Sequence, residues 1–95
     1  MPLREIYMYQ SFGEMVLLEK VLSGSRNIQF DDLVTLVEAF GFSLSRINGS
    51  HHIFTHPTIP ELINLQNRNG KAIPYQVRQF LILIEEYALT LEDEQ

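Results

Sequence analysis

The first half of the chain carries apolar residues at the spacing of an α-helix. Met15, Leu18 and Leu22 follow one another at three- and four-residue intervals, which places them on one helical face. The preceding residues 11–14 read Ser-Phe-Gly-Glu and match the capping box, in which two polar side chains satisfy free amides at a helix start. These features predict a first helix over residues 12–22.

A second apolar stripe predicts a helix over residues 30–40. Asp31 and Asp32 lie in its first turn, where the helix dipole stabilises negative charge. Gly41 follows, and glycine readily adopts the left-handed conformation that ends many helices. The stripe consists of Leu33, Val34, Leu36, Val37 and Phe40.

After this helix the pattern changes from helical to alternating. Residues 42–46 alternate Phe, Leu and Arg with serine, which predicts a half-buried strand. Residues 48–50 read Asn-Gly-Ser and favour a hairpin turn, so residues 51–55 are expected to form the returning strand. Residues 57–60 are bounded by two prolines and are predicted to form a loop, followed by a third strand over residues 62–66.

The last helix is predicted to begin at Pro74, because proline suits the first position of a helix. Its expected buried face comprises Val77, Phe80, Leu81, Ile84 and Ala88. We therefore expect an α+β fold of the order α-β-β-β-α, with a three-stranded antiparallel sheet and an extra N-terminal helix. This order is that of double-stranded RNA-binding domains.

Composition limits the kind of protein and site. A chain of 95 residues buries enough surface for one core, so we expect a single domain over residues 1–95 with a shallow site. The absence of cysteine excludes disulfides, thiolate nucleophiles and cysteine-based zinc sites. The longest apolar run, residues 80–84, is shorter than the roughly 18 residues of a membrane span, and no secretory signal pattern is visible. We expect a soluble, cytoplasmic protein with no membrane partner.

Charge is unevenly distributed along the chain, whose formal net charge is −5. Residues 1–41 hold three basic and six acidic residues, and residues 85–95 hold five acidic residues. Residues 42–84 hold four basic residues against the single acid Glu61. This locally basic middle suits a phosphate backbone, although ordinary solvated surface is the alternative interpretation. The four basic residues are Arg46, Arg68, Lys71 and Arg78.

All three histidines, at positions 51, 52 and 56, lie in this basic middle. Histidine can take or give a proton near neutral pH. Successive residues of a strand point to opposite faces, so His51 and His52 cannot share one site in a regular strand. The same alternation separates the histidines that could bind zinc. No cysteine, aspartate or nearby glutamate completes a tetrahedral set of ligands, so we expect no metal.

The residues around the histidines resemble the motif of HicA-type mRNA interferase toxins. In that family a glycine-phenylalanine ending the first helix leads through an arginine to Gly-Ser-His on the second strand. The resemblance covers residues 30–89 and places a HicA-like core at 28–90, with a helical N-terminal extension at 1–27 and an acidic tail at 91–95. The segments that carry it are Gly41-Phe42, Arg46, Gly49-Ser50-His51-His52-Ile53-Phe54 and His56-Pro57.

The resemblance implies a small, metal-independent endoribonuclease without a cofactor, acting as the toxin of a toxin–antitoxin pair. Its implied partners are mRNA and a HicB-type antitoxin, with a negatively charged antitoxin segment near the site; a homodimer and a hetero-oligomer with the antitoxin both stay open. The family's functional histidine follows Gly-Ser, which falls on His51. Where the family shows Pro-x-His after the third strand, this chain has Asn64-Leu65-Gln66.

RNA cleavage places simple demands on such a site. RNA carries its own nucleophile, the 2′-hydroxyl, so an enzyme needs chiefly a base, a proton donor for the leaving 5′-oxygen, and cations for the pentacoordinate phosphorane. His51 is the candidate base. The Ser50 hydroxyl, or the amides of the turn at residues 49–50, could orient a phosphate. The candidate RNA- and phosphate-binding residues are Arg46, Ser50, Lys71 and Arg78, and the secondary catalytic candidates are His52 and His56.

Each candidate also has a structural interpretation. His51 could order the hairpin through a hydrogen bond, Lys71 could lie in a flexible turn, and Arg78 could pair with Glu38 or Glu85. The alternative function is accordingly a non-catalytic RNA-binding or protein-interaction module of the same fold. The aromatic residues expected in the core rather than in base stacking are Phe30, Phe40, Phe42, Phe54 and Phe80.

Overall fold

The secondary-structure elements follow the predicted order. The computed structural model describes residues 12–24 and 26–91. It contains helices α1 (Phe12–Leu22), α2 (Phe30–Ala39) and α3 (Pro74–Glu86) and strands β1 (Ser43–Asn48), β2 (His51–His56) and β3 (Ile59–Gln66). The α+β fold, with an extra helix before the α-β-β-β-α order, is confirmed. Ser11 of the predicted capping box lies outside the described residues.

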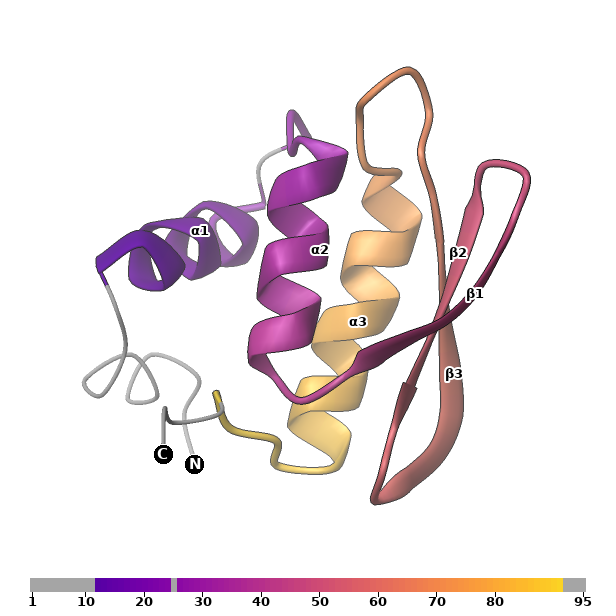
Figure 1. Ribbon diagram of the computed structural model, residues 1–95. Coiled ribbons are helices and arrows are strands. Elements are labelled where there is room, and N and C mark those ends of the chain that lie inside the picture. The colour runs from indigo at the N-terminus through magenta and orange to yellow at the C-terminus, as the bar shows by residue number, and fades with distance from the viewer. Residues whose placement is uncertain (1–11, 25, 92–95) are drawn as a thin grey trace.

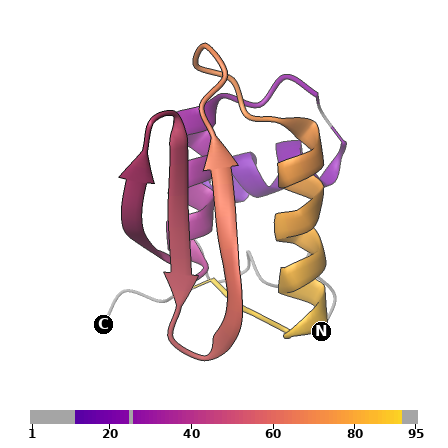
Figure 2. The ribbon, with the colours of Figure 1, turned by 90° about the vertical axis from the view of Figure 1, so that its right-hand side faces the viewer.

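One helical layer covers one face of the sheet. The strands are ordered β1-β2-β3 and are antiparallel, so β2 is central and the other two are edge strands. Helices α2 and α3 lie against the same face of the sheet, and α1 lies on the far side of α2 (Figure 1). Figure 2 shows the other face of the sheet turned toward the viewer, with α3 beside β3. We call this other face the open face, because no described helix covers it.

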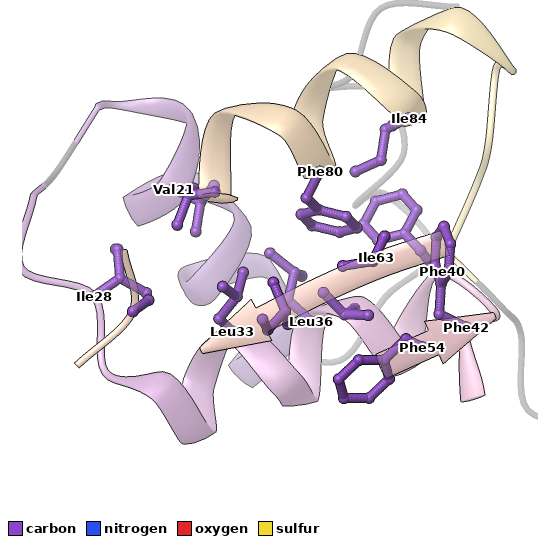
Figure 3. Close-up of a cluster of buried hydrophobic side chains, with 14 of the residues drawn as sticks. Val21, Ile28, Leu33, Leu36, Phe40, Phe42, Phe54, Ile63, Phe80 and Ile84 are labelled. Atoms are coloured by element: carbon purple, nitrogen blue, oxygen red, sulfur yellow. The ribbon is translucent and has the colours of Figure 1, made fainter. Parts of the chain in front are cut away.

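The core lies between the sheet and the helices. Phe40, Phe54 and Phe80 are fully buried and point into the same cluster (Figure 3). The ring of Phe80 packs edge-on against those of Phe40 and Phe42, with centroids 5.7 and 6.2 Å apart. The core assignment of the five phenylalanines is confirmed. Their rings are therefore not available for base stacking.

Two helices end in the same hydrogen-bonding pattern. After α2, the amide of Phe42 bonds the carbonyl of Val37 and Gly41 takes a φ of 95°. This is the Schellman motif, in which a left-handed residue lets the chain turn back over the last helical carbonyls.

Within the described residues, no helix is long and apolar enough to cross a membrane.

Helix α3 ends in the same Schellman motif, and the predicted burial of Ala88 is therefore wrong. Helix α3 ends at Glu86, and Ala88 takes the left-handed position with a φ of 51° and is exposed. The amide of Leu89 then bonds the carbonyl of Ile84 at 2.9 Å. Alanine is unusual at this position, because a Cβ disfavours positive φ. The apolar pattern therefore predicted a helix that extends beyond its actual end at Glu86. The chain instead turns back and buries Leu91.

Strand β1 is not half-buried, contrary to the alternation in its sequence. All six of its residues are exposed, and the buried Phe42 lies just before it. The pairing shifts between Leu44, opposite Phe54, and Arg46, opposite Ile53. Such a shift is a β-bulge, with one extra residue on the edge strand. Phe54 and Ile53 are neighbours in β2 and point to opposite faces of the sheet, so their partners Leu44 and Arg46 also point to opposite faces.

The predicted loop over residues 57–60 and the predicted start of the third strand are also wrong. Strands β2 and β3 are joined by a two-residue turn, and β3 begins at Ile59. The imidazole Nδ1 of His56 accepts a hydrogen bond of 3.1 Å from the amide of Thr58, which stabilises this turn. Pro60 lies inside an edge strand, where its missing amide costs least because no other described strand pairs with that side of β3.

Candidate functional site

His51 lies at the start of the central strand, on the open face of the sheet. Its Nδ1 is 3.1 Å from the amide oxygen Oδ1 of Asn64 on β3. A carbonyl oxygen can only accept, so in this arrangement Nδ1–H donates and Nε2 keeps its lone pair. The ring is half-buried. Its geometry is that of a histidine held in one tautomer with a nitrogen able to accept a proton.

Arg46 shares this face with His51. The register places Arg46 opposite Ile53 and Asn48 opposite His51, and residues paired across strands lie on the same face. The bulge in β1 produces this arrangement, because regular alternation from Leu44 would put Arg46 on the helix side. Ile53 lies between them on the central strand and is only 8% exposed.

His52 points the opposite way, as strand alternation predicts. Its ring lies edge-on to that of Phe30, at the start of α2, with the centroids 4.8 Å apart. Its Nδ1 is 3.3 Å from the carbonyl oxygen of Ser50, so this nitrogen donates. His52 is thereby engaged in packing the hairpin onto α2 and is not brought to the side of His51.

His56 lies at the far end of β2. It is five positions along the strand from His51, a distance of about 17 Å. Its ring packs edge-on to Phe42 at 4.9 Å, and its Nδ1 contacts both the amide and the hydroxyl of Thr58 at 3.1 Å. The returning strand was predicted to end at residue 55, but His56 is the last residue of β2 and orders the next turn. The three histidines are therefore in three different environments.

Within residues 12–24 and 26–91, no group of three histidine, cysteine, aspartate or glutamate side chains is placed to hold a metal ion.

The Gly49–Ser50 turn brings a second loop to the site. Gly49 has a φ of 64°, which glycine adopts at no steric cost. The carbonyl of Ser50 accepts a hydrogen bond of 2.9 Å from the amide of Asn67, the residue after β3. The next residue, Arg68, is exposed. Arg68 was not among the predicted phosphate binders, and it directly follows the residue that bonds the turn preceding His51.

Lys71 lies in the same loop, but its side chain is held by the segment before α2. Its Nζ donates a hydrogen bond of 2.6 Å to the Oδ1 of Asn27. Two backbone hydrogen bonds of 2.9 and 3.0 Å join Lys71 to Arg68. Lys71 is thus part of an ordered turn, and its predicted contact with phosphate remains a prediction.

Arg78 lies on the other side of α3 from the residues that face β3. It is two residues beyond Gln76, which corresponds to a rotation of about 200° around the helix. Gln76 bonds the backbone of β3, whereas Arg78 lines a depression of about 150 Å³ together with Arg26. The structure does not group Arg78 with His51 and Arg46. Its role toward RNA remains a prediction.

The single acid of the basic middle is engaged elsewhere. The hydroxyl of Tyr87, just after α3, donates to both carboxylate oxygens of Glu61 at 2.7 and 2.8 Å. This hydrogen bond, together with desolvation, raises the pKa of Tyr87 to about 12. Glu61 lies near the β2–β3 turn, at the end of the sheet remote from His51. The surroundings of His51 therefore keep their cationic character.

Two residues of this site were missed by sequence reasoning. Asn64 lay within a predicted strand and Arg68 within a predicted turn, and neither was assigned a role. The antiparallel pairing of β2 with β3 places Asn64 diagonally next to His51 and the residue before Arg68 against Ser50. Aligning the two predicted strands in antiparallel register would have been the available signal.

Comparison with known proteins agrees with this arrangement. No curated protein matches the chain in sequence. The family described as HicA toxin of bacterial toxin-antitoxin matches residues 30–85, from the first residue of α2 to the last turn of α3. The matched region covers more than half of the chain and includes the whole sheet and His51. The chain therefore belongs to the HicA toxin family of bacterial toxin–antitoxin systems.

Proposed function

We propose that the protein is a metal-independent endoribonuclease, the mRNA interferase toxin of its pair, with His51 as the general base. The observation that carries this proposal is the hydrogen bond between His51 and Asn64, which leaves Nε2 able to accept a proton on the open face. Family membership supports the role of a toxin. The position of Arg46 on the same face supports a phosphate as the reacting group.

The reaction uses the 2′-hydroxyl of the RNA itself. Nε2 of His51 removes the proton from this hydroxyl, and the 2′-oxygen attacks the adjacent phosphorus. The bond from phosphorus to the 5′-oxygen then breaks, and that oxygen takes up a proton from solvent. The products are a 2′,3′-cyclic phosphate and a 5′-hydroxyl end. In this proposal no step requires a bound metal, because the RNA supplies the nucleophile and His51 supplies the base.

Cations stabilise the charge that develops on the phosphorane oxygens. Arg46 is the first such group in our proposal, because it lies on the face of His51. The Ser50 hydroxyl and the amides of its turn orient the phosphate, and Arg68 contacts the neighbouring backbone. Lys71 and Arg78 are weaker candidates, since the structure directs Lys71 to Asn27 and places Arg78 beside Arg26.

An antitoxin is the implied protein partner of a toxin in this family. We expect a negatively charged segment of a HicB-type antitoxin to lie near His51, because the open face there carries positive charge and no described helix covers it. Covering this face would hide Nε2 of His51 from RNA.

The direct test is cleavage of an unstructured RNA by the purified protein in the presence of a metal chelator. We expect the wild type to release fragments with cyclic phosphate ends. His51→Ala should reduce the rate by about 10² to 10⁴-fold, the usual contribution of a general base. Thr55→Ala is the matched control, because Thr55 lies on the same strand and face at the end away from His51.

A His51→Ala protein that is folded and cleaves at the wild-type rate would contradict this assignment. Thermal unfolding of each variant shows whether it is folded. A wild type that binds RNA without cutting it would favour the non-catalytic binding module.

A further inference from the structure

A groove lies beside His51, between the free edge of β3 and helix α3. Its volume is about 220 Å³, and its lining includes Leu62, Asn64, Gln76, Gln79, Phe80 and Leu83. Asn64 belongs to both sites, because the same side chain holds the ring of His51. A molecule in this groove would therefore lie one residue away from the proposed base.

Three side-chain amides in the lining are each anchored at one end. Oδ1 of Asn64 accepts from His51, and Oε1 of Gln76 accepts a bond of 2.8 Å from the backbone amide of Gln66. Nε2 of Gln79 donates to the hydroxyl of Tyr75, also at 2.8 Å. Each bond therefore determines which end of the side-chain amide remains available to a ligand. Asn64 and Gln76 are left with NH₂ donors, and Gln79 is left with a carbonyl acceptor.

The backbone of β3 adds further hydrogen-bonding groups. The amide of Gln66 points away from β2, since it bonds Gln76 on α3. In an antiparallel pair, alternate residues point their backbone groups to opposite sides of the strand. The amide and carbonyl of Asn64 therefore point to the free edge of the sheet, where the groove lies.

At the end of the groove near His51, the lining residues are polar but uncharged. Among the described residues that line the groove, Glu61 alone has an ionisable side chain, and it bonds Tyr87. The remaining wall is apolar, with Leu62 57% and Ile82 59% exposed. Such a lining does not suit a phosphate, which is held by cations. It suits a neutral, flat group that has apolar faces and hydrogen-bonding edges.

We propose that this groove binds one unpaired nucleobase of the RNA, next to the bond that is cleaved. Recognition of RNA sequence commonly uses splayed-out bases bound on their faces by apolar groups and on their edges by hydrogen bonds. Two fixed donors and one fixed acceptor give the groove a preference among bases. The inference rests on the proposed ribonuclease function and assigns the sequence preference to α3 and the β3 edge.

The first experiment maps cleavage positions in a pool of unstructured RNA of random sequence. We expect wild type to show a preference at one nucleotide beside the cleaved bond. Gln79→Ala should weaken this preference about three- to tenfold, the worth of one hydrogen bond. Ile82→Trp should abolish it by filling the groove, while both variants still cut RNA. Glu85→Ala, exposed on α3 but outside the groove, should leave the preference unchanged.

The second experiment separates the groove from the catalysis. Binding of a short RNA with 2′-O-methyl groups, which lacks the nucleophile and is not cleaved, is compared with that of the same RNA carrying one abasic nucleotide, using the wild-type protein. We expect the abasic RNA to bind more weakly, and Gln79→Ala to reduce the difference.

The outcomes distinguish the two proposals. A wild type that cuts no RNA but discriminates against the abasic nucleotide would overturn the ribonuclease and retain the base site. Unchanged cleavage preference and unchanged abasic discrimination in both groove variants would overturn the base site. A loss of antitoxin binding alone in these variants would overturn it too, and would identify the groove as a protein-docking surface.

Discussion

Asn64 holds the ring of His51, and in the proposed mechanism it decides which imidazole nitrogen faces RNA. Its Oδ1 accepts from Nδ1 at 3.1 Å, on a face that is open to solvent. Without this acceptor the neutral ring can carry its proton on either nitrogen, and only one of the two forms has a basic Nε2. Asn64 is thus a positioning residue in the proposed mechanism.

Replacement of Asn64 tests this role. We expect Asn64→Ala to lower kcat about tenfold, since the ring loses its orientation, and to raise KM about three- to tenfold, since the groove loses one hydrogen-bond donor. Asn64→Asp should restore most of the rate and shift the acidic limb of the pH–rate profile to higher pH, because a carboxylate favours the charged imidazole. A profile identical to wild type in Asn64→Asp would show that the contact does not act on the base.

At the scale of the elements, the β-bulge in β1 decides which side chains reach the open face. The sequence Phe42-Ser43-Leu44-Ser45-Arg46 alternates regularly, and regular pairing would place Leu44 and Arg46 together. The extra residue at the bulge breaks this alternation, so Arg46 joins His51. Alternation in one strand cannot reveal a bulge, because a bulge is a property of two paired strands.

The contact between Glu61 and Tyr87 joins β3 to the end of α3 and is sensitive to alkaline pH. The pKa of Tyr87 is raised to about 12 from its ordinary value of 10. Because the pKa is higher in the folded protein, the stabilisation is fully present below pH 10 and is lost as the pH rises through 12. The neutral hydroxyl is the form that donates to the carboxylate.

Tyr87→Phe should therefore lower the free energy of unfolding by an amount that is constant from neutral pH to pH 10 and decreases toward pH 12. Urea unfolding at several pH values measures this difference. Titration of phenolate absorbance provides a second measurement, in which the variant should lack one late-titrating tyrosine. A difference that grows above pH 10 would contradict the assignment.

At the scale of the whole molecule, an acidic protein presents a locally basic site. The formal net charge is −5, yet Arg46 and Arg68 lie around the start of β2 and the single acid of the middle segment is bound by Tyr87. Phosphate contacts release counterions from RNA, so their number is read from the dependence of binding on salt. The site rather than the net charge should govern this dependence.

We expect binding of single-stranded RNA to weaken as salt is raised, with a log–log slope of about −0.7 for each phosphate contacted. Arg68→Ala should make the slope less steep by about 0.7, because one contact is lost. Arg26→Ala is the matched control, since Arg26 lies in the separate depression with Arg78. Equal effects of the two variants would show that binding follows total charge rather than this site.

The sequence by itself determined the helices, their order with the strands, and the separation of His51 from His52. Each of these follows from a local period, from a turn signal, or from the alternation of side chains along one strand. It also contained the motif by which the resemblance selects His51. The phenylalanine core followed in the same way, because apolar periodicity and burial are directly related.

Only the tertiary structure decided the composition of the proposed site. The His51–Asn64 hydrogen bond, the side on which Arg46 lies and the approach of Arg68 to Ser50 all depend on the register between strands. Register is set by the joint packing of residues distant in the sequence, and a single strand carries no record of it. Tertiary packing also decided that α3 turns Gln76 toward β3, which leaves Arg78, a predicted phosphate binder, on the other side of the helix beside Arg26.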